Sequence, residues 1–135
     1  MPTRVFFHCI QALNLICPDD DYAPLPLATI ECFDNDAQTP KIKKDEERTY
    51  SPFWDYNCVF VSERAHLQDQ TLVVKVFNSD SWIKNKVLGQ YVFELAEINA
   101  LPTHEYYRQW CVLTHPDDDT ECVGWLKCTI TVLLE

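Results

Sequence analysis

Glycine is scarce in this sequence, with only 2 among 135 residues. Loops that cradle phosphate groups need several closely spaced glycines, so a glycine-rich nucleotide-binding loop is excluded. The sequence also lacks an uninterrupted apolar run of the roughly 18–20 residues that span a bilayer. The apolar stretch near the N-terminus is short and is interrupted by His8 and Gln11, which predicts that it is not a secretory signal peptide.

Basic residues are outnumbered by acidic ones. The chain has 11 Lys and Arg against 21 Asp and Glu, which gives a formal net charge of −10. Nucleic-acid binding is driven by Lys and Arg side chains that displace counterions from phosphates, so this charge predicts no nucleic-acid partner. The same charge disfavours unaided docking on anionic lipid. A basic protein or a cation is the easier partner.

Closely spaced cysteine pairs are missing as well. The number of cysteines, 7, is odd, so complete internal disulfide pairing is impossible. No C-x-x-C is present, which argues against a zinc site. Most cysteines lie in apolar, strand-like runs, which favours reduced core thiols in a cytosolic protein. The positions are Cys9, Cys17, Cys32, Cys58, Cys111, Cys122 and Cys128.

Motifs of common enzyme classes are absent: the sequence contains no G-x-S-x-G, P-loop or H-E-x-x-H. We therefore predict that the protein is not an enzyme. A Cys–His pair brought together by folding is the remaining catalytic alternative. The histidines are scattered along the chain, at His8, His66, His104 and His115.

Short alternating apolar and polar runs recur along the chain and are separated by polar gaps with Pro or Asp. This spacing is typical of an all-β protein, and the length fits one domain over residues 1–135. A single helical turn is predicted at Ala96–Leu101. The predicted strands are Val5–Leu15, Leu27–Phe33, Lys41–Tyr50, Tyr56–Val61, Thr71–Phe77, Val87–Leu95, Tyr107–Leu113 and Gly124–Leu134.

These eight short strands must bury one face each. An antiparallel Greek-key β-sandwich of two sheets does so, and a closed eight-stranded barrel is the alternative. The last strand shows the pattern best, because its odd positions from Lys127 to Thr131 are polar and the residues between them are apolar. The third strand is polar and is the weakest of the eight.

Four landmarks of this sequence resemble the C2 domain family. Thr49–Asp55 (Thr-Tyr-Ser-Pro-Phe-Trp-Asp) is similar to the family's Asn-Pro-x-Trp-Asn turn, in which Pro fixes a turn dihedral and Trp seals the sandwich end. The other landmarks are Ala12-Leu13-Asn14-Leu15 before a Pro- and Asp-rich loop, Leu72-x-Val74-x-Val76-x-Asn78-x-Asp80 before loop three, and Val87-Leu88-Gly89 after it.

The C-terminal third resembles the end of a ferlin C2 domain, notably the second C2 domain of the ferlin array. Ferlins are large tail-anchored membrane-trafficking proteins with several C2 domains, so the resemblance implies one such module; a free-standing C2 protein is the alternative. A strand at each end of the chain implies the permuted (type II) strand order. The matching residues are Tyr107-x-x-Trp110-x-x-Leu113-x-x-Pro116-Asp117-Asp118 and Gly124-Trp125-Leu126-Lys127, with Trp125 where ferlins have Tyr.

Consecutive antiparallel strands bring alternate connections to the same end of a sandwich. This parity gathers Pro18–Asp21, Ser51–Asp55, Asn78–Lys86 and Pro116–Asp119 at one end. C2 domains bind calcium at that end, so the resemblance implies that any calcium site of this chain lies there.

Calcium takes about six to eight oxygen ligands, mostly from several carboxylates. The resemblance implies about five Asp ligands in loops one and three, and this chain departs from that set. Leu25 stands at the end of loop one, Asn78 replaces the first Asp of loop three, and Lys86 lies near the third. One missing carboxylate about 4 Å from the ion removes roughly 4 kcal/mol of attraction. The remaining candidates, for a weak Ca²⁺ site only, are Asp19, Asp21, Asn78 and Asp80.

The other aspartates of this end form an acidic rim. Asp20 belongs to it from loop one, and Asp117, Asp118 and Asp119 belong to it from the last connection. The rim is interpreted either as a solvated surface that aids solubility or as part of a weak calcium site.

The tip of loop three carries Trp82 and Ile83 beside Lys84 and Lys86. An exposed Trp-Ile pair flanked by lysines suits a bilayer interface, so these four residues are candidates for membrane or partner contact. Folding of Trp82 back onto the sandwich is the alternative.

The basic run Lys41-x-Lys43-Lys44 lies near the place where C2 domains carry a lipid head-group patch. Acidic residues follow at once at 45–47, which favours an ordinary solvated strand edge over phosphoinositide binding.

We therefore predict a cytoplasmic, non-catalytic C2-like module with degenerate calcium-binding loops. Its expected role is packing or protein interaction, with neighbouring domains or a protein partner, in membrane trafficking or vesicle fusion. The alternative is a peripheral C2 domain that docks on phospholipid membranes through the loop-three tip, with weak or no calcium dependence. Fold-level analogy supports the trafficking role.

Overall fold

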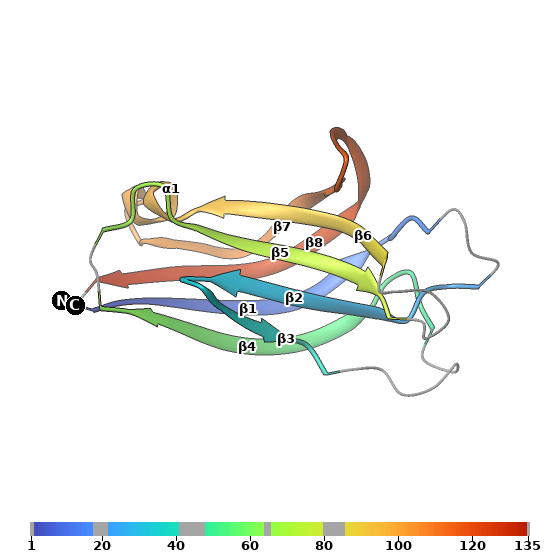
Figure 1. Cartoon of the computed structure of the whole chain (residues 1–135), viewed down its shortest axis with the longest axis horizontal. Coiled ribbons are helices and arrows are strands. Elements are labelled where there is room, and N and C mark those ends of the chain that lie inside the picture. The colour runs from blue at the N-terminus through green and yellow to red at the C-terminus, as the bar shows by residue number, and fades with distance from the viewer. Residues whose placement is uncertain (1, 18–21, 41–47, 64–65, 80–85, 135) are drawn as a thin grey trace.

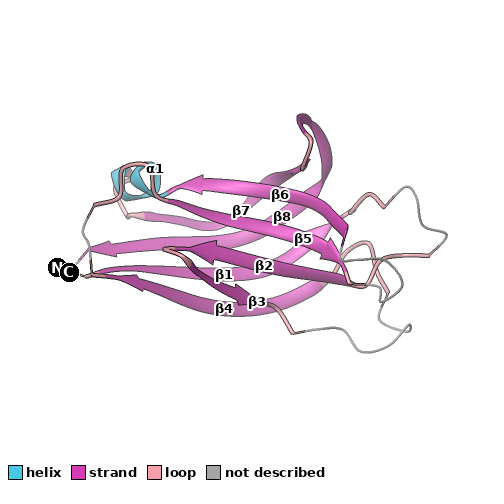
Figure 2. Ribbon diagram, in the orientation of Figure 1, coloured by secondary structure: helices cyan, strands magenta, loops and turns pink. Residues whose placement is uncertain are grey.

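The computed structural model describes residues 2–17, 22–40, 48–63, 66–79 and 86–134. The elements are mostly strands, as Figure 2 shows, and they follow the alternation of buried and exposed residues. In chain order they are β1 (Thr3–Leu13), β2 (Pro26–Cys32), β3 (Asn35–Gln38), β4 (Phe53–Ser62), β5 (Thr71–Asn78), β6 (Lys86–Glu94), α1 (Leu95–Ala100), β7 (Glu105–His115) and β8 (Asp118–Leu134).

The strands are antiparallel and follow the order β3-β2-β5-β6-β7-β8-β1-β4. Its two halves, β3-β2-β5-β6 and β7-β8-β1-β4, lie face to face (Figure 1), and they are linked at β6–β7 by one residue pair, Gln90 with Thr114. Within the described ranges β3 and β4 do not pair, which favours the sandwich over the closed barrel. The predicted antiparallel β-sandwich is therefore confirmed.

Both chain ends lie together at one end of the sandwich. Thr3 pairs with Leu134 on β8 and with Ser62 on β4, so β1 lies between the last strand and the fourth. Figure 1 shows the two termini at the end opposite the connections β1–β2, β3–β4 and β5–β6. This arrangement confirms the permuted, type II strand order.

The third strand was predicted in the wrong place. The prediction was Lys41–Tyr50, whereas the structure has β3 at Asn35–Gln38, paired with β2; residues 41–47 lie outside the described residues, and 48–50 are not in a strand. Phe33 and Asp34 have φ angles of 52° and 62°, and they form the two-residue turn between Cys32 and Asn35. Tight hairpins need such positive φ values, and the usual Asn-Gly signal is absent here.

The core lies between the two halves. Phe7 of β1 meets Phe93 of β6 edge to face, with ring centroids 5.9 Å apart. In β8 the apolar residues from Leu126 to Val132 are buried and alternate with outward-facing polar residues, as the pattern predicted. The helical turn predicted at Ala96–Leu101 is present as α1.

The seven cysteines are free thiols in the structure, and five of them are buried. Burial raises the pKa of the Cys32 thiol to about 12 and that of Cys58 to about 11, with a repulsive contribution from Cys58 at Cys32. Buried thiols of this kind pack as small apolar groups.

Candidate functional site

Segments of the β1–β2 and β3–β4 connections meet at the end of the sandwich away from the termini, which we call the loop end. The Leu15 N–H donates to the Tyr50 carbonyl at 2.9 Å, and the Thr49 N–H donates to the Pro24 carbonyl at 2.9 Å. The segments after β1, before β2 and before β4 are thereby tied together (Figure 1). Trp54, from the predicted Pro-x-Trp turn, is partly buried against the core nearby.

A buried network of hydrogen bonds occupies the interior of the loop end. Asn78, the last residue of β5, is only 6% exposed. Its Oδ1 accepts a hydrogen bond from the Leu25 N–H at 3.1 Å, and its Nδ2 donates to Cys17 Sγ at 3.7 Å. The Ser79 N–H and hydroxyl both donate to the Leu25 carbonyl, each at 2.9 Å. The hydrogen bond from the Leu25 N–H thus fixes the direction of the Asn78 amide oxygen and engages one of its lone pairs.

Two described residues beside Asn78, Leu25 and Lys86, carry no carboxylate. Leu25 is buried and apolar. Lys86, the first residue of β6, is the cross-strand partner of Asn78 and is half-buried. A cation beside the expected ligand position opposes a bound cation.

Several predicted site residues lie outside the described residues. They comprise the loop-one aspartates, the second aspartate of loop three, the loop-three tip and the basic run. Within the part of the chain that the structure describes, no group of three His, Cys, Asp or Glu could hold a metal ion. The predicted residues that are not described are Asp19, Asp20, Asp21, Asp80, Trp82, Ile83, Lys84, Lys41, Lys43 and Lys44.

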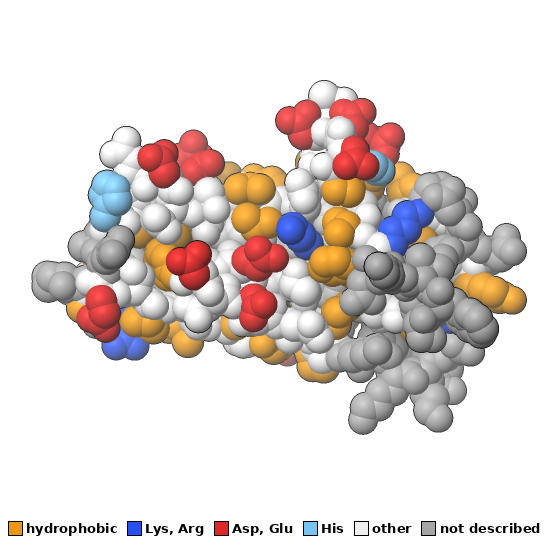
Figure 3. All heavy atoms as spheres, viewed as in Figure 1, with side chains coloured by type: hydrophobic (Ala, Val, Ile, Leu, Met, Phe, Trp, Pro, Cys, Tyr) orange, Lys and Arg blue, Asp and Glu red, His pale blue; other side chains and the backbone are white. Residues whose placement is uncertain are grey.

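The last acidic segment forms the tip of the β7–β8 hairpin. Asp117, Asp118 and Asp119 are exposed there, and the hairpin stands out from the sandwich (Figures 1 and 3). Asp118 Oδ1 accepts hydrogen bonds from the Thr120 hydroxyl at 2.6 Å and the Thr120 N–H at 2.9 Å. These bonds lower the pKa of the Asp118 carboxyl. The carboxylate therefore stabilises its own turn.

The reasoning from sequence missed the solvent-facing side of β7-β8-β1-β4, which we call the outer face. Cross-strand partners share a face, so the pairs of Phe6 with Val59 and of His8 with Thr129 mark it. A groove of about 620 Å³ lies on this face, with Phe6, Val59 and Tyr107 among its lining. The alternation in β1 and β4 is a signal that could have revealed it.

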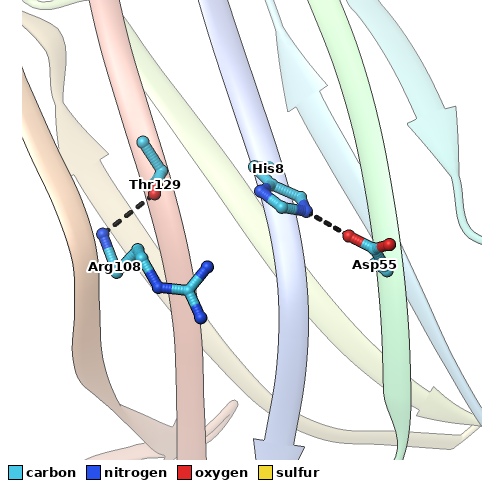
Figure 4. A network of polar contacts seen from close by, with 4 residues as sticks. All are labelled: His8, Asp55, Arg108 and Thr129. Atoms are coloured by element: carbon cyan, nitrogen blue, oxygen red, sulfur yellow. Dashed lines mark hydrogen bonds and ion pairs between the residues drawn. The ribbon is translucent and has the colours of Figure 1, made fainter.

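Polar groups occupy the middle of the outer face (Figure 4). His8 Nε2 and Asp55 Oδ1 are 2.6 Å apart, and the Arg108 N–H donates to the Thr129 hydroxyl at 2.9 Å. Arg108 has a φ of 48° in a bulge of β7, where the register shifts between Tyr106 and Gln109. The bulge brings the Arg108 side chain to the groove.

Comparison with known proteins identifies a family. The family model described as "C2 domain" matches residues 3–113. Ferlin 2 of Tetrahymena thermophila is 28% identical over 125 residues, which are 92% of this chain and 7% of that protein. Myoferlin of Xenopus tropicalis is 26% identical over 94 residues, 69% of this chain and 5% of that protein. The chain therefore spans a small part of these curated relatives.

Solved structures share the fold. A C2 domain of plant Extended Synaptotagmin 1 superposes with a TM-score of 0.76 at 19% identity, covering 98% of this chain and 96% of that one. Human GIVD cytosolic phospholipase A2 superposes with a TM-score of 0.73 at 12% identity, covering 100% of this chain and 18% of that one. Helices long and apolar enough to cross a bilayer are absent from the described ranges.

Proposed function

This chain belongs to the C2 domain family, and we propose that it works as a non-catalytic packing or protein-interaction module with degenerate calcium loops. The relatives are ferlins of far greater length, which supports a role for residues 1–135 as one domain of a longer cytoplasmic membrane-trafficking protein. Its partners would be neighbouring domains or another protein.

The buried state of Asn78 carries the proposal. A calcium ligand must turn its oxygen toward the ion, but Asn78 Oδ1 accepts the Leu25 N–H at 3.1 Å in a buried position. Freeing that oxygen would leave the Leu25 N–H without its acceptor, at a cost of about 1–3 kcal/mol. The binding energy of the ion would have to offset that cost. Lys86, which is positively charged like the ion, lies beside this position and repels it.

A calcium titration by calorimetry tests this proposal. We expect no binding tighter than the millimolar range and no rise in melting temperature at about 100 µM calcium, because a ligand of the folded state must stabilise it. Magnesium at matched ionic strength is the control. A calcium Kd below about 10 µM would contradict the proposal.

Paired variants locate any weak binding. Asp19→Asn/Asp80→Asn removes carboxylates from loops one and three, and Asp117→Asn/Asp118→Asn removes two from the hairpin tip. Weak binding at the calcium loops is lost only in the first variant. Loss only in the second assigns the ion to the acidic hairpin.

The loop-three tip supports a second candidate, docking on phospholipid membranes with weak or no calcium dependence. Trp82 and Ile83 are flanked by Lys84 and Lys86, a composition that suits the bilayer interface. In co-sedimentation with neutral and anionic liposomes, Trp82→Ala/Ile83→Ala should lose binding, whereas Trp125→Ala should keep it. No binding of the wild type, with either lipid and with or without calcium, would remove this candidate.

A further inference from the structure

The outer face exposes several large apolar side chains. Phe6, Val59 and Tyr107 are 43%, 51% and 63% exposed. Exposed apolar side chains gathered on one face are typical of an interaction surface. The other exposed apolar residues of this face are Phe53, Val61, Trp110, Trp125 and Leu133.

A polar row crosses the middle of this face. Thr129 pairs with His8, and His8 pairs with Asn57, so the row runs from Arg108 on β7 to Asn57 on β4. Asp55 reaches the same row through its contact with His8 and is exposed. Figure 4 shows the Arg108 side chain reaching from β7 across β8, and Asp55 on β4 beside His8 of β1.

Arg108 is an available cation. Its guanidinium makes no ion pair within the ranges that the structure describes, although the chain has a net charge of −10. Glu105, the other charged residue of β7, is engaged with the Thr131 hydroxyl at 2.7 Å. The polar row thus carries a positive group at its β7 end and a negative group at its β4 end.

We propose that the outer face is a self-association surface, on which two copies of this chain pack sheet against sheet about a two-fold axis parallel to the strands. Arg108 of each copy would then meet Asp55 of the other. The proposal goes beyond the function proposed above, which requires only some protein partner, and it does not depend on the calcium loops.

The charges select this axis. A two-fold axis along the strands places β7 of one copy over β4 of the other, so Arg108 lies opposite Asp55 in both halves of the dimer. An axis across the strands would place β7 over β7 and bring the two Arg108 side chains together. Opposite charges at the ends of one row therefore favour the first arrangement.

Tyr107 fills the groove in the same arrangement. It precedes Arg108 on β7 and is 63% exposed. Over β4 of the second copy it faces the groove wall that contains Asn57 and Val59. A protruding aromatic residue in an apolar groove is a typical anchor of an interface.

The available area fits a weak dimer. Strands about 4.8 Å apart and about ten residues long give this four-stranded face a plan area of roughly 600 Å². Standard interfaces bury about 800 Å² per partner, about a tenth of the surface of a small protein. We therefore expect a dimer that forms at high micromolar concentration.

Sedimentation velocity across chain concentrations up to about 1 mM tests the proposal. The wild type should change from the mass of one chain to that of two. Val59→Glu should keep the mass of one chain throughout, because it places a charge in the apolar contact. Val92→Glu is the matched control: Val92 is 44% exposed on β6, in the other half of the sandwich, and its change should leave the dimer intact.

A charge exchange tests the predicted contact itself. Arg108→Asp and Asp55→Lys should each weaken the dimer about tenfold or more, because each creates two like-charge contacts. An equimolar mixture of the two variants should form a dimer again, since both contacts of the mixed pair are then attractive. Asp55 has a φ of 48°, a conformation that lysine adopts less readily than aspartate. If Asp55→Lys does not fold, Asn57→Lys takes its place, because it puts a positive charge on the same row.

Two results would overturn the proposal. One is a wild type that keeps the mass of one chain up to about 1 mM. The other is a dimer that survives Val59→Glu or is not restored in the mixture. Neither result bears on calcium binding or on interaction with a different protein, so failure here is distinguishable from failure of the proposed function.

Discussion

The loop end and the outer face differ in how they use their polar groups. At the loop end, Asn78 and Ser79 are buried and form hydrogen bonds with the backbone of Leu25. On the outer face, the Arg108 guanidinium has no ion-pair partner within the described ranges, and Asp55 is exposed beside His8. Binding capacity depends on groups that the fold leaves unsatisfied. The region in which the family resemblance places calcium binding has used such groups internally, whereas the outer face, for which the sequence predicted no function, still presents them.

Leu25→Asp should give the largest effect and tests whether the loop end is a packed interior. The new carboxylate would be buried among apolar groups, so we expect a loss of about 3–5 kcal/mol in the free energy of unfolding, measured in urea. Val92→Asp, on an exposed strand position, should lose less than about 1 kcal/mol. Equal losses would mean that Leu25 is not packed as described.

Asn78→Asp should have a smaller effect at the same place. The carboxylate can still accept the Leu25 N–H, but it cannot donate to Cys17, and it buries a charge. We expect a loss of about 1–3 kcal/mol, against little change for the exposed Asn57→Asp. Calcium should not restore the lost stability. A melting point that recovers with micromolar calcium would show that one carboxylate completes the site.

Alkaline pH should weaken the whole sandwich through its buried thiols. The pKa of Cys58, in the wall of the groove, is raised from 9.0 to about 11 by burial, and that of Cys32 is raised to about 12. The unfolded chain therefore releases these protons first, and stability falls as the pH rises from about 9 to about 11. Cys58 is only partly buried, so solvent screening reduces its share of this fall. Urea titrations of Cys32→Ala/Cys58→Ala should show a shallower fall. An equally steep fall would assign the effect to other groups.

Asp55 should show the smallest effect on stability. The ion pair with His8 is exposed, so Asp55→Asn should cost no more than about 1 kcal/mol. Asp55→Ala should cost about 1 kcal/mol more, because Asp55 has a φ of 48° and asparagine tolerates that conformation better than alanine. Thermal melting of the two variants measures the difference, and identical melting points would contradict the backbone explanation.

Strand positions were predictable where inward-facing apolar residues recur at every second position. β1 and β5 show that pattern and were predicted close to their observed places, whereas only the C-terminal part of β8 was predicted. β3 was misplaced because its turn depends on the positive φ of Phe33 and Asp34, which their residue types do not reveal. β8 begins at Asp118 and not at Gly124, because backbone pairing with β7 continues through a polar segment.

Composition and periodicity were sufficient to determine the all-β class and the absence of glycine-rich phosphate loops, because these follow from local residue patterns. The permuted sandwich was expected from the resemblance to C2 domains. Only the tertiary structure decided which polar groups are already satisfied. The contact of Asn78 with Leu25 and the gathering of Arg108, His8 and Asp55 on one face join residues far apart in the chain. Such contacts depend on strand pairing across the sheet, and no local pattern in the sequence specifies them.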